Sequence, residues 1–284
     1  MGILRVVATP IGNLEDISSR ALRSLAEADR VFAEDTRRTR ILLDRYDIKA
    51  KPVSLHEHNE ASRIKGALEL LRDGGQIAVV SDAGTPLISD PGGRLVAAAI
   101  EDGHRVEPIP GPSAVLSALA VAGFATTPFA FLGFLPRAKG ARATLLQSYL
   151  GRPEALVIFE SPRRVEATLL ELAGCFEHRK GSVARELTKR HEEVVRDSLL
   201  RLAETFAEEA RGEFTIVVEG GTEAEESSSE RGLLAGEALD SRLRELLADG
   251  RRPREITAEI APQTALPRKQ LYSRVVALKD EAGK

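Results

Sequence analysis

The residues best suited to chemistry lie between Val79 and Gly93, in the sequence VVSDAGTPLISDPGG. The apolar run from Gln76 to Val80 predicts a buried parallel strand, and a loop rich in Gly, Pro, Ser, Thr and Asp follows it. In an open α/β sheet, ligands bind beyond the carboxyl ends of the strands. The loop therefore supplies the first candidate site residues: Asp82, Ala83, Gly84, Thr85 and Pro86. The alternative is a tight connection in which Asp82 and Asp90 only cap turns and helix starts.

A second candidate loop, Pro110-Gly111-Pro112-Ser113-Ala114, follows another strand-like run. It places backbone N–H groups and a hydroxyl at the start of a helix, which suits a carboxylate or another small anion. The alternative is an ordinary capped helix with Pro112 near its first turn.

The common nucleotide-binding fingerprints are absent from the chain. No G-x-G occurs, which excludes the usual Rossmann loop, and Gly-Lys occurs only at the last two residues, which excludes a P-loop. His56 and His58 are isolated from other metal ligands, so we expect no metal site.

The surrounding sequence predicts the sheet that positions these loops. Strand-like runs alternate with helical patterns, at residues 3–9, 30–34, 52–55, 76–80 and 105–109. This alternation predicts a parallel sheet with right-handed crossovers. Because each polar cluster follows a strand, we expect one pocket at the carboxyl edge of that sheet.

After Gly123 the pattern changes to that of a smaller mixed sheet. Strands are predicted at residues 129–134, 155–159, 183–185, 192–196 and 214–219. The acidic, serine-rich stretch that follows predicts a linker, and three helical patterns come after it, the last two with helix-turn-helix proportions. The fold class is therefore α/β, with two α/β domains and a helical tail. The expected bounds are 1–115, 116–220, a linker at 221–236 and a tail at 237–284.

Composition limits the functions that the chain can have. The 284 residues carry a formal net charge of −3, so no field of the whole molecule attracts nucleic acid or anionic lipid. The single cysteine excludes an internal disulfide, and no apolar stretch reaches the length of a membrane helix. We therefore expect a soluble cytoplasmic protein with no membrane partner.

Eight strings of residues, in order, carry a family resemblance. They are TPIGNLEDIS (9–18), AEDTRRT (33–39), LHEHNE (55–60), SDAGTPLISDPG (81–92), PIPGPSA (108–114), FLGFLP (131–136), FESPRR (159–164) and RELTKRHEE (185–193). Together they resemble the ribosomal RNA small subunit methyltransferase I family, within the tetrapyrrole methylase superfamily. The resemblance implies methylation of the ribose 2′-OH of a decoding-centre cytidine in 16S rRNA.

The resemblance also implies S-adenosylmethionine, folded up in the cleft between the two α/β domains. The matching positions of this chain are Pro10, Ile11, Asp82, Thr85, Ser113, Ala114, Phe159 and Glu160. Tetrapyrrole enzymes of the superfamily carry a G-x-G-P-G loop near the start, whereas this chain has Thr9-Pro10-Ile11-Gly12-Asn13. That departure points away from a porphyrinoid substrate.

Methyl transfer to a 2′-OH needs positioning of the two reactants and help in removing a proton. The candidate bases end strands that face the expected cleft, and they are Asp35, His56, Glu57 and Glu160. The clustering of His56 and Glu57 places them slightly ahead. The alternative is that these residues orient RNA or hold their loops.

Basic residues next to the same loops are candidates for phosphate contacts. They are Arg37, Arg38, Arg40, Arg137, Arg163 and Arg164, joined by Arg268 and Lys269 in the tail. The alternatives are solvated faces and, for the tail, helix packing or support of a homodimer. The expected partners are 16S rRNA within the small ribosomal subunit and a second copy of the chain. Two other functions remain open, a methyltransferase acting on a tetrapyrrole-like small molecule and a non-catalytic nucleotide-binding module.

Overall fold

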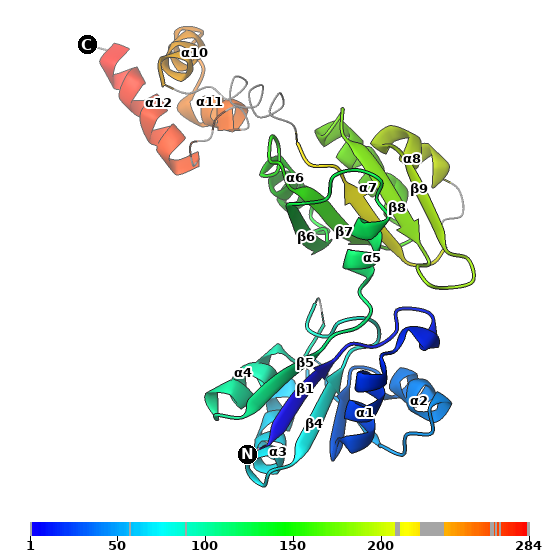
Figure 1. Ribbon diagram of the computed structural model, residues 1–284. Helices are drawn as coiled ribbons and strands as arrows, with labels where there is room; N and C mark the ends of the chain where they lie inside the picture. Colours follow the sequence, from blue (N-terminus) through cyan, green and yellow to red (C-terminus); the bar gives the residue numbers. More distant parts are fainter. Residues whose placement is uncertain are drawn as a thin grey trace. The chain divides into compact units, whose positions relative to one another are not determined.

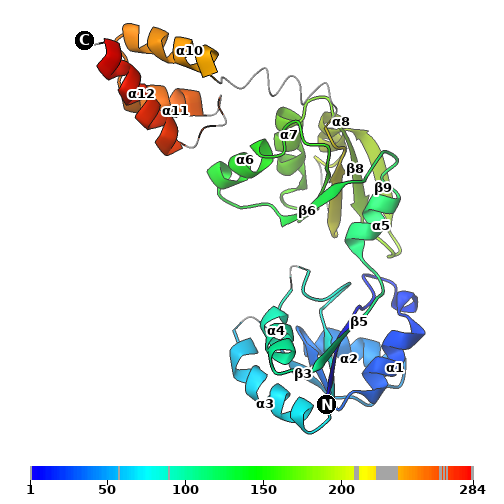
Figure 2. The ribbon, with the colours of Figure 1, turned by 60° about the vertical axis from the view of Figure 1, so that its left-hand side comes forward.

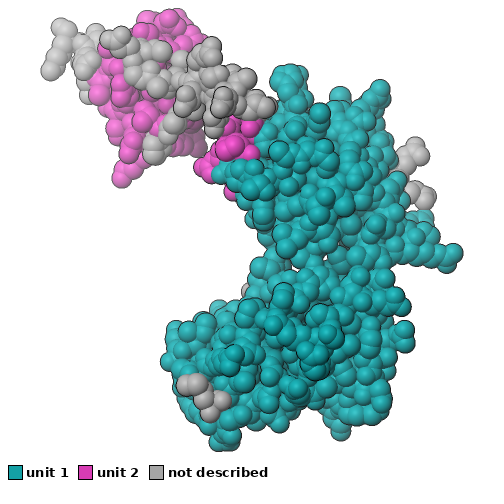
Figure 3. Space-filling model, viewed as in Figure 1, with its two compact units in different colours: residues 1–143, 154–220 teal, residues 144–153, 221–284 magenta. Residues whose placement is uncertain are grey.

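The structure is a computed structural model that describes residues 2–56, 58–88, 90–207, 211–221, 236–261, 264, 266 and 268–282. The chain divides into two compact units, one of residues 1–143 and 154–220 and one of residues 144–153 and 221–284 (Figure 3). The larger unit contains two five-stranded sheets, and the smaller unit contains the C-terminal helices.

The first sheet is parallel throughout, with the strand order β3-β2-β4-β1-β5 (Figure 1). Its strands are β1 (Ile3–Val7), β2 (Arg30–Ala33), β3 (Pro52–Ser54), β4 (Gln76–Val80) and β5 (Arg105–Ile109). The helices between them are α1 (Ser19–Glu27), α2 (Thr36–Arg45), α3 (Glu60–Arg72) and α4 (Gly93–Glu101), and a 3₁₀ turn, η1 (Leu14–Asp16), precedes α1.

Alternation of side chains along the strands builds a separate core on each face of this sheet. Ala78 and Val80 of β4 pack in the core of α1 and α2, whereas Ile77 and Val79 pack in the core of α3 and α4. A strand covered on both faces must be apolar at every position, which explains the continuous run at the end of β4. Figure 2 shows the two helix pairs on opposite sides of the sheet.

The second sheet is mixed, with the order β6-β7-β10-β8-β9 and one parallel pair, β6 with β7. Its strands are β6 (Phe129–Phe134), β7 (Ala155–Glu160), β8 (Lys180–Arg185), β9 (Glu193–Ser198) and β10 (Phe214–Val218). Its helices are α5 (Ala114–Ala120), α6 (Lys139–Gln147), α7 (Val165–Cys175) and α8 (Leu199–Thr205).

The predicted α/β class and the mixed character of the second sheet are confirmed, but one strand starts earlier than its sequence indicates. The prediction began β8 at Val183, whereas the strand begins at Lys180 and includes Gly181. A Cβ on Gly181 would lie only 2.7 Å from a methyl carbon of Leu202 in α8. Close packing of α8 therefore favours glycine at this position. Because glycine has no side chain, the alternation of apolar residues does not reveal the start of this strand.

The C-terminal helices form a small bundle with its own core. They are α10 (Gly236–Ala248), α11 (Pro253–Ile260) and α12 (Arg268–Ala282). Leu243, Ile256, Ile260 and Leu271 are fully buried in their shared core. The predicted linker lies almost entirely outside the described residues. Among the described helices, none is long and apolar enough to cross a membrane.

We predict that Phe32→Ala destabilises the larger unit severely. Phe32 of β2 is 1 % exposed, and its removal leaves a cavity in the core beneath α3 and α4. We expect a loss of about 3–5 kcal/mol in the free energy of unfolding, measured by urea denaturation. Ile41→Ala on α2 is the control, because Ile41 is 63 % exposed and its change should stay within about 0.5 kcal/mol. Equal effects of the two variants would contradict the assignment of Phe32 to the core.

Candidate functional site

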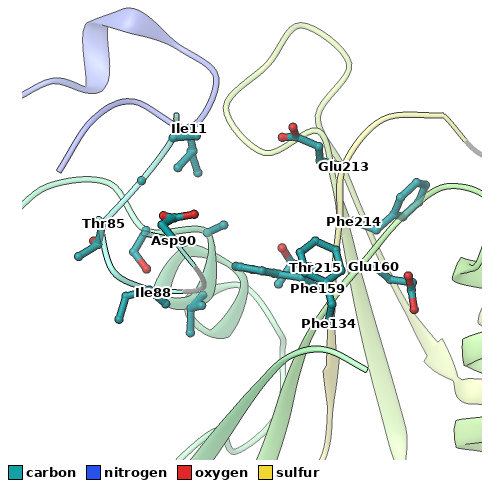
Figure 4. Close-up of a pocket in the computed structure, with 15 residues that line it drawn as sticks. Ile11, Thr85, Ile88, Asp90, Phe134, Phe159, Glu160, Glu213, Phe214 and Thr215 are labelled. Atoms are coloured by element: carbon teal, nitrogen blue, oxygen red, sulfur yellow. The ribbon is translucent and has the colours of Figure 1, made fainter. Parts of the chain in front are cut away.

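One pocket of the larger unit lies at the carboxyl ends of the parallel strands of the first sheet (Figure 4). Its volume is about 260 Å³, close to the lower end, roughly 300 Å³, of the range for small-molecule sites. Six of the predicted cofactor residues line it: Ile11, Thr85, Ser113, Ala114, Phe159 and Glu160. The predicted contacts Pro10 and Asp82 instead line a separate pocket of about 60 Å³, together with Ser81 and Arg38.

Backbone hydrogen bonds join the loops that form one wall of the pocket. Thr9 and Gly84 exchange two of them, at 2.9 and 3.0 Å, which ties the loop after β1 to the loop after β4. The Thr85 hydroxyl donates to the Pro112 carbonyl oxygen at 3.3 Å and so adds the loop after β5. Gly84 has a φ of +77°, and a Cβ there would lie 3.3 Å from Ile11 Cγ2. This close approach favours glycine at position 84.

Aromatic side chains form the opposite wall. Phe134 of β6 and Phe159 of β7 both line the pocket, with their ring centroids 5.9 Å apart in an edge-on arrangement. Phe134 is 59 % exposed although it is large and apolar. An exposed aromatic ring at the rim of a pocket is typical of a surface that stacks on a flat ligand.

Two carboxyl groups with raised pKa values lie near Asp82, and one of them, Asp90, lines the pocket. Burial, followed by the neighbouring charge of Asp82, raises the pKa of Glu34. Burial also raises the pKa of Asp90, a hydrogen bond from Ser81 opposes that shift, and the charge of Asp82 adds to it. Burial and the neighbouring negative charge therefore disfavour the ionised form of these two carboxyl groups. A cationic ligand beside them would stabilise that form. No group of three or more His, Cys, Asp or Glu side chains suited to a metal occurs among the described residues.

Comparison with known proteins identifies the family of the chain. The model of the Tetrapyrrole (Corrin/Porphyrin) Methylases matches residues 4–203. The chain belongs to this family. The chain is also 42% identical over 276 residues to "Ribosomal RNA small subunit methyltransferase I" of Halalkalibacterium halodurans, covering 96% of this chain and 94% of the relative. The relative of the same name from Thermotoga maritima is 47% identical over 221 residues, covering 78% of this chain and 99% of the relative. The predicted resemblance is confirmed.

A solved structure shares the fold. It is the uroporphyrin-III C-methyl transferase from Thermus thermophilus complexed with S-adenyl homocysteine, with a TM-score of 0.55 and 20% identity. The match covers 79% of this chain and 99% of that chain. At this identity the likeness establishes the tetrapyrrole methylase fold.

Two of the predicted bases are already engaged in holding the structure. Asp35 caps α2 by accepting from the Arg37 amide at 2.8 Å, and it pairs with the Arg37 guanidinium at 2.7 Å. Hydrogen bonds from Arg37 lower the pKa of Asp35 to about 2. A lowered pKa means that this interaction is present above the ordinary value of 3.8 and is lost only as the pH falls toward 2. Near neutral pH, Asp35 is therefore a weak base.

The second is Glu160, whose carboxylate is fully buried. It accepts from the Ser161 amide at 2.8 Å and from the Thr168 hydroxyl at 2.8 Å, and it pairs with Arg164 at 3.3 Å. Figure 4 shows its side chain directed away from the cavity, although the residue lines the pocket. These contacts engage the Glu160 carboxylate in holding the end of β7.

The remaining predicted bases are His56 and Glu57. The His56 amide donates to Asn59 Oδ1 at 2.8 Å, and His56 Nε2 lies 3.1 Å from Asn59 Nδ2. Since an amide nitrogen donates, His56 Nε2 accepts and the ring hydrogen is assigned to Nδ1. His56 does not line the pocket, and Glu57 lies outside the described residues.

Some of the predicted RNA-contacting residues have partners within the chain, and others are exposed. Arg37 pairs with Asp35, Arg38 lies 3.6 Å from Asp82, and Arg164 pairs with Glu160. Arg40 donates to the Ala50 carbonyl oxygen at 3.5 Å. Arg137 and Arg163 are exposed, and Arg268 and Lys269 belong to the smaller unit. The structure therefore gives part of this set a local role.

Sequence reasoning missed several pocket residues, of which Asp90, Ile88, Phe134, Glu213 and Thr215 are examples. The sequence indicates a turn cap at Asp90, and the available signal of a site residue is its position in the loop after β4. Glu213 gives no such signal, because it precedes β10 and reaches the pocket through the antiparallel pairing of β10 with β7.

We predict that Thr168→Val destabilises the larger unit, because it removes a hydrogen-bond donor from the buried Glu160 carboxylate. The expected loss is about 1–3 kcal/mol in the free energy of unfolding, from urea denaturation. Thr205→Val is the matched control, since the exposed Thr205 hydroxyl donates to the Arg201 carbonyl oxygen and contacts no carboxylate among the described residues. If both variants unfold at the same denaturant concentration, the Thr168 hydroxyl does not stabilise the carboxylate.

Proposed function

We propose that the chain transfers a methyl group from S-adenosylmethionine to the ribose 2′-OH of a decoding-centre cytidine in 16S rRNA, within the small ribosomal subunit. The observation that carries the proposal is the pocket, which combines the joined loops of the first sheet with an aromatic wall from the second. The names of the relatives support the choice of ribosomal RNA. The proposal includes a cytoplasmic location, a homodimer and the division of the α/β region near residue 115.

The pocket suits S-adenosylmethionine on two counts. The apolar groups of Ile11, Phe134 and Phe159 offer a surface for the adenine ring. Asp90, which lines the pocket and has no ion-pair partner among the described residues, supplies negative potential for the positive sulfonium. When bound, this cofactor would supply the methyl group as an electrophile.

The proton of the 2′-OH needs an acceptor, and Asp90 is the best placed carboxylate. Of the acids that line the pocket, Glu160 pairs with Arg164 and Glu213 pairs with Lys189 at 2.9 Å. Asp90 has no ion-pair partner among the described residues. Its raised pKa makes it a better proton acceptor than Asp35. In the proposed mechanism an Asp90 carboxylate oxygen would accept the proton of the 2′-OH, which makes the ribose oxygen a better nucleophile.

The decisive experiment is incubation of unmodified small ribosomal subunits with labelled S-adenosylmethionine. We expect label on a single cytidine ribose of the 16S rRNA, located by mapping the modified nucleotide. Subunits that already carry the modification serve as the control and should remain unlabelled. Label on a base, or on no nucleotide, would refute the proposed function.

We predict that Asp90→Asn lowers kcat by roughly 10²- to 10⁴-fold and retains affinity for S-adenosylmethionine, because it removes a general base. A base with a raised pKa loses activity as the pH falls through that pKa, so the wild-type rate should decline on the acid side and the residual rate of the variant should not. Asp73→Asn, at the exposed end of α3, is the control. A variant that loses only cofactor binding would show that Asp90 holds the cofactor and is not the base.

A further inference from the structure

The C-terminal bundle carries a groove that its packing does not explain. The groove lies in the smaller unit, has a volume of about 510 Å³, and is lined by Arg254, Thr257, Arg268, Lys269 and Tyr272. Arg254 belongs to the first turn of α11, whereas Arg268, Lys269 and Tyr272 belong to the start of α12. We propose that this groove docks the ribose-phosphate backbone of the RNA substrate.

Acidic residues of the bundle pair with basic residues that do not line the groove, so the groove remains cationic. Arg274 makes a double hydrogen bond with Asp240, Arg242 pairs with Glu245, and Arg251 pairs with Glu259. Glu255 accepts from the Arg252 amide at the start of α11. These contacts engage most of the described acids of the bundle. No ion pair is found, among the described residues, for the three cations of the groove.

The helix geometry turns an aromatic ring toward the same groove. Arg268 and Tyr272 are four residues apart and therefore share one face of α12. Leu271 and Val275 fill the core, and Tyr272 remains 40 % exposed. Thr257, a buried residue of the lining, donates its hydroxyl hydrogen to the Pro253 carbonyl oxygen at 2.7 Å, so this donor already has a partner within the bundle. Core packing thus accounts for Leu271, Val275 and Thr257 and leaves Tyr272 for another contact.

Exposed cations beside an exposed aromatic ring fit RNA better than another partner. Arginine and lysine bind phosphates, and a tyrosine ring stacks on an unpaired base of any identity. The net charge of −3 gives no attraction over the whole surface, so a local cationic groove is the means by which this chain can hold a polyanion. The identity of the RNA rests on the proposed function, whereas the groove itself lies outside the methyl-transfer pocket.

The test compares two double variants that remove equal charge. Arg268→Gln with Lys269→Gln removes two cations from the groove. Arg244→Gln with Lys279→Gln removes two exposed cations that do not line it. Binding to unmodified small ribosomal subunits and to protein-free 16S rRNA is measured over a range of salt concentrations, with kcat and KM for the subunits.

We expect the groove variant to bind about tenfold more weakly than the control on both RNA samples. Its plot of log affinity against log salt should be shallower by about 1.4–1.8, because two phosphate contacts are lost. KM for the subunits should rise while kcat and affinity for S-adenosylmethionine stay unchanged. Tyr272→Ala should also weaken binding, and Tyr272→Phe should not, since the ring is kept.

Two results would overturn the inference. One is an equal salt dependence for both double variants. The other is a loss that occurs on intact subunits and not on protein-free rRNA, which would mean that the groove contacts a ribosomal protein. A wild-type chain that transfers no methyl group, yet loses RNA affinity in the groove variant, would refute the proposed function and leave the inference standing.

Discussion

The pair of backbone hydrogen bonds between Thr9 and Gly84 is the constraint on which the pocket depends. Neighbouring parallel strands diverge where their ladders end, so the loops that follow β1 and β4 would otherwise be free to separate. The pair extends the contact into the loops, and the Thr85–Pro112 hydrogen bond adds the loop after β5. Because Gly84 has a positive φ and contacts Ile11, the same residue sets the loop conformation and the position of an apolar pocket residue.

Charge pairing decides which carboxylate is free for chemistry. Asp35, Glu160 and Glu213 each lie beside a basic residue, and Asp82 accepts from the Asp35 amide at 2.8 Å. These contacts hold the loops in place. Asp90 has burial and a like charge nearby instead, which raise its pKa. The same distribution gives the pocket negative potential for a cationic cofactor and one carboxylate able to accept a proton.

Sequence patterns predicted the pocket residues whose place depends only on where the backbone of a strand ends. The loops after β1, β4 and β5 could be predicted to meet, since parallel strands end at one edge, and Ile11, Thr85, Ser113 and Ala114 do line one pocket. Side-chain direction could not be predicted. Glu160 ends a strand as expected, yet its carboxylate bonds to Thr168, eight residues later, and is directed away from the cavity. Turn-forming residues surround Asp90, so the local sequence indicates a turn cap. Its burial depends on residues that are distant in the sequence, and it could not be predicted from the local pattern.

The loop between β8 and β9, in the second sheet, contacts the loop after β1 in the first sheet. Thr188 accepts from the Asn13 amide at 2.9 Å, and a Cβ on Gly12 would lie 2.7 Å from the Thr188 hydroxyl oxygen. Lys189 joins Glu186 to Glu213, at 2.8 and 2.9 Å. Since Glu213 lines the pocket and Gly12 follows Ile11, this loop connects both walls. The close approach of this loop therefore favours glycine at position 12.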